Sequence, residues 1–225
     1  MPNSGFNVLL SVNNLRRLAL GLCGTLEIAM ISVVISVVLG VFYGLLMTKK
    51  NRFIYVLCRV YLDAFRIVPI LVWLFLLFFG SAIVFHTDLD GVTVSVIIFS
   101  MWGTAEMGDI VRGTVSSIPT HQWQSAQALG LTQWQVHRFV IIPQALRRIA
   151  PSAINLITRM VKTTSLVVFV GVTEILRVGK QIIEFNMMKN PMASFWIYGF
   201  IFFVYFLICY PISKFSKKLE KKWSY

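Results

Sequence analysis

The chain has 225 residues, of which 57% are hydrophobic and 13% are charged, and its formal net charge is +12. A soluble domain of this size could not solvate so much apolar surface, so the composition favours a bilayer as solvent and a single membrane domain over residues 1–225. The basic residues flank apolar segments, a placement that orients a membrane protein and argues against nucleic acid as the partner.

Five apolar segments predict an all-α integral membrane protein with five transmembrane helices. Their approximate bounds, in chain order, are 19–47, 53–80, 91–112, 146–170 and 194–213. At about 1.5 Å per residue each segment is long enough to cross roughly 30 Å of hydrocarbon, the longer ones by tilting. Pro69 in the second segment and Pro151 in the fourth predict kinks.

The first two segments carry small and charged residues with specific packing consequences. Gly40 and Gly44 form a G-x-x-x-G pattern, which allows close approach either to a helix of the same chain or to a second copy. In the second segment, Asp63 and Arg66 are three residues apart and can form a local ion pair.

The third segment contains two acidic residues one helical turn apart, Glu106 and Asp109, with Arg112 a further turn on. Charged groups inside a bilayer cost roughly 2.5–3.5 kcal/mol each, so they face a partner charge or a water-filled path. Asp109 and Arg112 can therefore be a structural pair, whereas Glu106 is a candidate to bind the ammonium group of a zwitterionic substrate.

A polar segment, 120–143, separates the third and fourth apolar segments and predicts two short helices joined by a glycine. Gly130 suits the left-handed turn that ends the first helix, and Thr132 with Gln135 has the pattern of a capping box. Pro143 predicts a change of direction before the next apolar segment. A compact helix–Gly–helix loop attached to a membrane bundle is typical of a docking surface for a soluble partner.

The fourth segment carries a polar stripe. Asn155, Arg159 and Lys162 fall at positions i, i+4 and i+7, which lie on one face of a helix. Two interpretations remain open. Lys162 can pair with an acidic residue of another span, or the stripe can line a cavity in which Arg159 binds a substrate carboxylate.

The distribution of charge predicts the orientation. Five lysines lie between Lys214 and Lys222 near the C-terminus, whereas the loop after the second segment carries Asp88 and Asp90 and no Lys or Arg. Because basic residues favour the cytoplasmic side, the C-terminus is expected in the cytoplasm and, with an odd number of spans, the N-terminus outside. The loop 120–143 is then cytoplasmic, in a multi-pass membrane protein.

The same loop resembles the "EAA" motif of ABC importer permeases, whose pattern is Glu-Ala-Ala, three residues, Gly, nine residues and Ile-x-Leu-Pro. The matching residues are Gln124-Ser125-Ala126, Gly130 and Val140-Ile141-Ile142-Pro143, with Gln in place of the Glu and Ser in place of the first Ala. The segments DAFRIVPILVWLF, GDIVRGTVSSIP and KTTSLVVFVGVTEILR are similar to those of the polar amino-acid permeases of histidine or glutamine transport.

This resemblance implies a fold like that of type I ABC importers, a location in a bacterial inner membrane and a set of partners. These are a dimer of cytoplasmic ATP-binding subunits, a second permease copy or a homologous permease, and an extracytoplasmic substrate-binding protein. The expected contacts with the ATPase, or the residues that shape its docking loop, are Trp123, Gln124, Ala126, Leu129, Gly130, Trp134 and Pro143. Packing of the two tryptophans against the chain's own helices is the alternative. Glu106, Asp109, Asn155, Arg159 and Lys162 are the candidates for the substrate pathway.

The resemblance also bears on substrate and cofactors. The usual Lys-Asp-Thr-Ser run is Lys162-Thr163-Thr164-Ser165 here, and Leu156 follows Asn155, so the fourth segment lacks acidic residues. This favours a neutral or acidic amino acid, such as glutamine or glutamate, over a cationic one. No G-x-x-x-x-G-K-[ST] motif occurs, so ATP and Mg²⁺ are expected on the partner subunit and no cofactor on this chain.

Other functional classes find less support. The chain's three histidines are scattered, which predicts no metal site, and no nucleophile is paired with a base, which argues against an enzyme. The main alternative is an autonomous secondary or proton-coupled amino-acid carrier that uses Glu106 and Asp109 as proton relays. That alternative leaves the helix–Gly–helix loop without a role.

Overall fold

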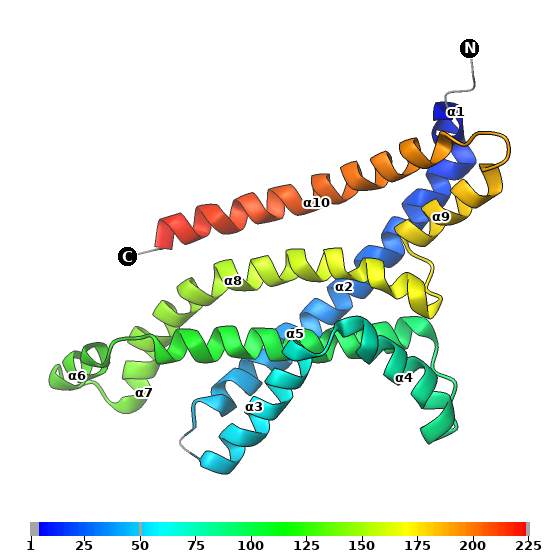
Figure 1. Ribbon diagram of the computed structural model, residues 1–225. Coiled ribbons are helices and arrows are strands. Elements are labelled where there is room, and N and C mark those ends of the chain that lie inside the picture. Colours follow the sequence, from blue (N-terminus) through cyan, green and yellow to red (C-terminus); the bar gives the residue numbers. More distant parts are fainter. Residues whose placement is uncertain (1–4, 50, 224–225) are drawn as a thin grey trace. The chain divides into compact units, whose positions relative to one another are not determined.

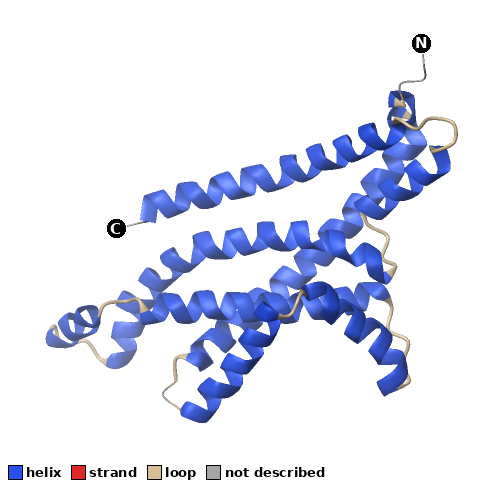
Figure 2. Cartoon of the chain, viewed as in Figure 1, coloured by secondary structure: helices blue, strands red, loops and turns tan. Residues whose placement is uncertain are grey.

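The computed structural model describes residues 5–49 and 51–223, and every regular element within these ranges is a helix (Figure 1). The predicted all-α class is therefore confirmed, and Figure 2 shows only helices and the short loops that join them. The α-helices are α1 (Phe6–Leu10), α2 (Val12–Met47), α3 (Arg52–Ile67), α4 (Ile70–Phe85), α5 (Gly91–Ser116), α6 (Thr120–Ala128), α7 (Gln133–Gln135), α8 (Ile142–Thr163), α9 (Ile175–Asn186) and α10 (Ala193–Trp223). A π-helical turn, η1 (Val136–Ile141), precedes α8, and a 3₁₀ segment, η2 (Thr164–Val170), follows it.

Four helical stretches are long and apolar enough to cross a bilayer, and a bent pair of helices is a fifth candidate. The four are α2, α5, the run Gln133–Val170 and α10, and the pair is α3 with α4. These correspond in order to the five predicted segments. The fourth begins earlier than predicted, because α7 and η1 lead into α8 without an interruption.

The second candidate span is broken, because the axes of α3 and α4 differ in direction by 100°. Pro69 lies at the break, and Val68 before it is extended, with φ −81° and ψ 128°. Proline lacks an amide hydrogen and disfavours the helical conformation of the residue before it, which explains why α3 ends here. The predicted kink is thus confirmed as a complete break, whereas α8 continues through Pro151.

The chain divides into two compact units, and each is assembled from three separate stretches of sequence. The first comprises the residues up to Ser32, Ile70–Ile98 and Arg159–Pro211. Its core joins the start of α2 to α9 and the start of α10. Buried members of this core include Leu18, Ile175, Val178, Ile182 and Ile197. The expectation of one domain over residues 1–225 stays a prediction.

The second unit comprises Val33–Pro69, Phe99–Thr158 and the residues from Ile212 onward. Its core joins the second half of α5 to α6, η1 and α8. Buried members of this core include Met107, Val111, Ala126, Val136, Ile141 and Leu156. The loop predicted to dock a partner is therefore anchored by side chains that lie in the same core as α5 and α8.

The G-x-x-x-G pattern of α2 makes a contact within the chain. A Cβ atom on Gly40 would lie 2.5 Å from the Cβ atom of Met107, and one on Gly44 would lie 2.6 Å from the carbonyl oxygen of Gly108. Neither distance leaves room for a side chain, so both glycines are required for α2 to pack this closely on α5. Of the two alternatives, the structure supports the contact with a helix of the same chain.

Candidate functional site

The loop 120–143 has the local structure that its sequence predicts. Gly130 has φ +80°, in the left-handed region, and lies just after the end of α6. The Thr132 hydroxyl accepts a hydrogen bond from the amide of Gln135, and the Gln135 side chain accepts one from the amide of Thr132. The glycine turn and the capping box are both confirmed.

Pro143 does not interrupt the helix, and the predicted change of direction there stays a prediction. Pro143 lies in the first turn of α8, where its missing amide hydrogen is tolerated. Upstream, the amide of Ile142 donates to the carbonyl of His137, five residues back, as in a π-helical turn. The change in hydrogen-bonding pattern accommodates the proline, and the helix continues into the membrane segment.

The side chains of this loop fall into an inward and an outward set. Ala126 is buried, and Trp123 packs on the core of the second unit with its ring edge-on to His137, at a centroid distance of 4.8 Å. Leu129 and Trp134 are 82% and 69% exposed, and Gln124 is also exposed. The two tryptophans thus have different environments, since the chain's own core holds Trp123 whereas Trp134 faces outward.

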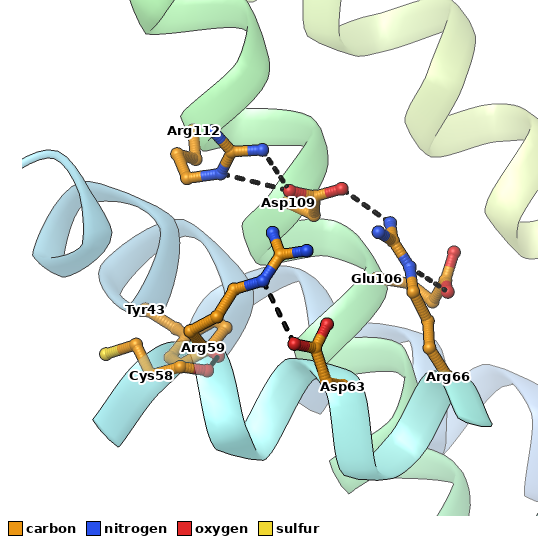
Figure 3. A network of polar contacts seen from close by, with 8 residues as sticks. All are labelled: Tyr43, Cys58, Arg59, Asp63, Arg66, Glu106, Asp109 and Arg112. Atoms are coloured by element: carbon orange, nitrogen blue, oxygen red, sulfur yellow. Dashed lines mark hydrogen bonds and ion pairs between the residues drawn. The ribbon is translucent and has the colours of Figure 1, made fainter. Parts of the chain in front are cut away.

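A network of charged side chains joins α3 to α5 (Figure 3). The Asp109 carboxylate accepts from Arg66 at 2.5 Å through one oxygen and from Arg112 at 2.6 Å through the other. Glu106 lies one turn away, with its carboxylate 3.7 Å from the Arg66 guanidinium. The hydroxyl of Tyr61 also donates to the carbonyl of Met101, which fixes α3 to α5 a few turns from the ion pairs.

The ion pairs observed for the charged residues of α3 differ from the predicted pair of Asp63 with Arg66. Asp63 accepts from Arg59 at 3.0 Å, whereas Arg66 turns toward the two carboxylates of α5 (Figure 3). The spacing i, i+4 lets Asp63 pair within its own helix, and Arg66 is thereby available for α5. The expected pair of Asp109 with Arg112 is confirmed.

The polar residues of α8 lie on one exposed stripe. Asn155, Arg159 and Lys162 are all exposed in the single chain, whereas Leu156 and Met160 between them are buried. No carboxylate among the described residues lies within ion-pair distance of Lys162, so the structure does not show the acidic partner considered for it. An exposed polar stripe on a membrane helix requires a water-filled path or another polypeptide beside it. A shared substrate role for the stripe and Glu106 stays a prediction.

A buried glutamate at the start of α9 is a feature that the sequence predictions missed. Glu174 is fully buried and caps α9, because its carboxylate accepts from the amide of Arg177 at 2.7 Å. Its second oxygen lies 3.4 Å from the hydroxyl of Thr25 on α2. The i, i+3, i+4, i+7 spacing of apolar residues and glycine after Glu174 was the available signal for α9.

The position of Glu174 depends on two glycines of α2. A Cβ atom on Gly21 would lie 3.0 Å from the Cα atom of Ile175, and one on Gly24 would lie 2.9 Å from the carbonyl oxygen of Thr173. Burial raises the pKa of the Glu174 carboxyl above its usual value, although its hydrogen bonds act in the opposite direction. Tertiary packing therefore holds the Glu174 carboxyl group in a buried position, where desolvation disfavours its charged form.

No group of three or more His, Cys, Asp or Glu side chains suited to a metal ion occurs among the described residues. The polar features that remain are the exposed loop, the charge network of α3 and α5 and the stripe of α8. Such features in an all-helical membrane protein favour a transport component over a membrane-embedded enzyme.

The chain belongs to the family described as "binding-protein-dependent transport system inner membrane component", whose model matches residues 36–222. It is 32% identical to a probable amino-acid ABC transporter permease protein of Bacillus subtilis, over 98% of this chain and 95% of that one. It is 23% identical to a putative glutamine transport system permease protein of Rickettsia conorii, over 88% of each chain.

A similar solved structure is described as an amino acid ABC transporter with histidines. The match has a TM-score of 0.83 and 26% identity, and it covers 95% of this chain and 97% of the other. The chain is thus a multi-pass permease of an amino-acid ABC importer that works with ATP-binding subunits, and it is not an enzyme. Family membership favours this class over an autonomous carrier.

Proposed function

We propose that this chain is the translocation subunit of an importer for neutral or acidic polar L-amino acids. Two permease chains, identical or homologous, would form the pathway, and an extracytoplasmic binding protein would deliver the substrate. ATP and Mg²⁺ would bind the partner subunits, which dock on the loop 120–143 from the cytoplasm. The N-terminus would then lie outside and the C-terminus inside.

The observation that carries the proposal is the exposed helix–Gly–helix loop. Two of its exposed apolar side chains, Leu129 and Trp134, lie on either side of Gly130. Large apolar and aromatic residues of this kind commonly anchor protein interfaces. The inner side of the loop is packed on α5 and α8 through Ala126 and Val136. A movement of the docked partner would therefore be transmitted to two candidate spans.

The substrate class follows from the charges of α8. Its exposed stripe carries Arg159 and Lys162 and no acidic residue, so it can bind a carboxylate and does not attract a cationic side chain. The ammonium group would be bound by Glu106, and Asn155 would supply neutral hydrogen bonds. The glutamine permease among the relatives supports a neutral substrate.

Recovery of partners from detergent-solubilised membranes tests the docking role. Tagged wild-type chain is expected to recover an ATP-binding protein in stoichiometric amount, with ATPase activity. Gly130→Val is expected to insert normally but to lose the partner or its coupling to uptake, because a β-branched residue strains the left-handed conformation. Gly199→Val is the matched control, since nothing lies within 4 Å of that position on α10. Gly130→Asn should retain most function.

Wild-type partner recovery and uptake in Gly130→Val would disprove the docking role. Recovery of the chain alone, without ATPase activity, would restore the autonomous carrier as the better interpretation, and Glu106 and Asp109 would become the residues to test.

Uptake measurements test the substrate class. Arg159→Gln is expected to weaken uptake of glutamine or glutamate at least tenfold, because a charge-assisted hydrogen bond to the carboxylate contributes roughly 1.5–3 kcal/mol. Arg52→Gln, at the exposed start of α3, is the control for loss of one positive charge. Unchanged affinity and rate in Arg159→Gln would exclude this carboxylate site. Competition by histidine or arginine stronger than by glutamine would disprove the neutral or acidic preference.

A further inference from the structure

A polar cavity of about 310 Å³ lies within the second unit, beside the docking loop. Its walls come from three helices that are far apart in the sequence. The lining residues are Gln122 of α6, Gln144, Arg147 and Arg148 of α8, and Trp223 of α10. The volume is at the lower end of the range of small-ligand sites, roughly 300–1,000 Å³. A neighbouring hollow of about 180 Å³ shares both arginines and the tryptophan.

The donors on the wall are partly fixed in position. The side-chain amide of Gln144 donates to the side-chain carbonyl of Gln122 at 3.2 Å, which ties α8 to α6. Arg148 donates to the carbonyl and the hydroxyl of Ser117 at 3.4 and 3.2 Å. Within the described ranges, Arg147 has no hydrogen bond or ion pair through its guanidinium. Its planar donors therefore remain available for an anion.

The surroundings of the cavity are strongly basic. The last turns of α10 carry exposed Lys217, Lys218 and Lys222, against the single acidic side chain of Glu220. Glu220 lines the neighbouring hollow, yet no ion pair joins it to either arginine among the described residues. The excess of positive charge favours an anionic ligand.

The position of the cavity along two candidate spans indicates the source of that anion. Both α8 and α10 change from apolar to basic sequence beside it. Leu146 and Phe215, next to these basic stretches in the sequence, are 59% and 55% exposed. Trp223 is half-buried, as is usual for a tryptophan at the level of lipid head groups. Basic side chains and exposed apolar side chains thus occur together at this end of α8 and α10.

We propose that this cavity binds the phosphate of an anionic phospholipid head group, with Arg147 as the principal ligand and Arg148 and Gln144 as supporting donors. Basic pockets between membrane helices are suited to such head groups. The bound lipid would brace α6 against α8 and α10, because all three helices contribute lining residues to one cavity. The proposal is independent of which amino acid is transported.

Native mass spectrometry of the purified full-length chain, titrated with phosphatidylglycerol, tests the site. Wild-type chain is expected to retain a tightly bound lipid. Arg147→Gln should weaken this binding roughly fivefold, the effect of one basic residue near an anionic lipid. Arg138→Gln is the matched control, because Arg138 is exposed on η1 and does not line the cavity. Arg147→Lys should keep most of the binding, and its elution from a sizing column checks the fold.

Three further measurements can overturn the proposal. Equal retention of phosphatidylcholine would show that the head-group charge is not recognised. Displacement of the lipid by millimolar sodium phosphate, with phosphate binding equally well, would assign the cavity to a free phosphate. Unchanged lipid binding in Arg147→Gln, together with lost recovery of the ATP-binding protein, would assign it to a protein contact.

Discussion

The loop between α6 and α7 and the charge network of α3 and α5 belong to the same compact unit, but different kinds of contact hold them. In the loop, the hydrogen bonds that shape the turn and the cap join residues three to five apart, such as Thr132 and Gln135. In the network, Arg66 contacts Asp109, 43 residues further along the chain. The loop is exposed, whereas the side chain of Asp109 is 17% exposed.

This difference explains which features a sequence pattern can predict. A capping box and a left-handed glycine depend on backbone geometry within one turn, so their residues are sufficient to predict them. An ion pair between helices depends on how both helices rotate and pack. Arg66 had a local partner within reach, Asp63, but the packing of α3 on α5 placed two other carboxylates nearer.

Glu174 extends the comparison to the first unit. Like Thr132, it caps a helix through the amide three residues later. Unlike Thr132, it is fully buried and lies beside Thr25, 149 residues away. The same type of helix cap is therefore exposed to solvent at Thr132, whereas tertiary packing buries it at Glu174.

The largest expected effect is at Asp109. Asp109→Asn removes the charge that compensates Arg66 and Arg112, and we expect a loss of about 2 kcal/mol in the free energy of unfolding. This figure is below that of a fully buried pair because the side chain of Arg66 is 42% exposed. Thermal unfolding in detergent micelles would measure it, with Asp63→Asn as the control for a more exposed pair.

A double-mutant cycle of Asp109→Asn with Arg66→Gln sharpens this prediction. The two losses should be less than additive, because each variant removes the same contact. Strict additivity would mean that the pair contributes nothing to stability. The claim that long-range ion pairs stabilise the packing of α3 on α5 would then be wrong.

An intermediate effect is expected at Glu174. Glu174→Ala leaves the partly buried amide of Arg177 without its acceptor and should cost about 1.5 kcal/mol, whereas Glu174→Gln keeps an acceptor and should cost less. Unfolding midpoints of the three proteins in micelles would show this order.

The pH dependence at Glu174 has a definite sign. Because burial raises the pKa of Glu174 in the folded state, the folded protein holds this proton more tightly than the unfolded chain. The contribution of Glu174 to the free energy of unfolding is therefore largest below the ordinary pKa of glutamate. It declines as the pH rises through the raised pKa of the folded state. Glu174→Gln should lose this decline, and identical pH profiles for the variant and the wild type would contradict the assignment.

The smallest effect is expected in the loop. Thr132→Ala removes the exposed capping hydroxyl, and we expect a cost of about 0.5 kcal/mol, at the lower end for helix caps. Thr132→Ser, which keeps the hydroxyl, is the control. Hydrogen exchange at the amide of Gln135 would report the change locally. A cost as large as that at Asp109 would show that the loop is not held by local contacts.

Local patterns were sufficient for much of this protein. Apolar length predicted the membrane segments, and Pro69 predicted the place where the second one breaks. For the loop 120–143, the sequence predicted the glycine turn and the capping box, and the resemblance of its motif indicated the family of the chain. Pro143 lies in the first turn of α8, where a proline is tolerated because its missing amide hydrogen has no partner within the helix.

By itself, the sequence determined that this is an all-helical amino-acid permease with an exposed helix–Gly–helix loop, since hydrophobic length, turn chemistry and motif spacing are all properties of neighbouring residues. Only the tertiary structure decided that Gly40 and Gly44 pack on α5, that Arg66 joins Asp109, and that Glu174 is buried against α2. These contacts depend on the rotation and close approach of helices distant in the chain, and no local pattern specifies either.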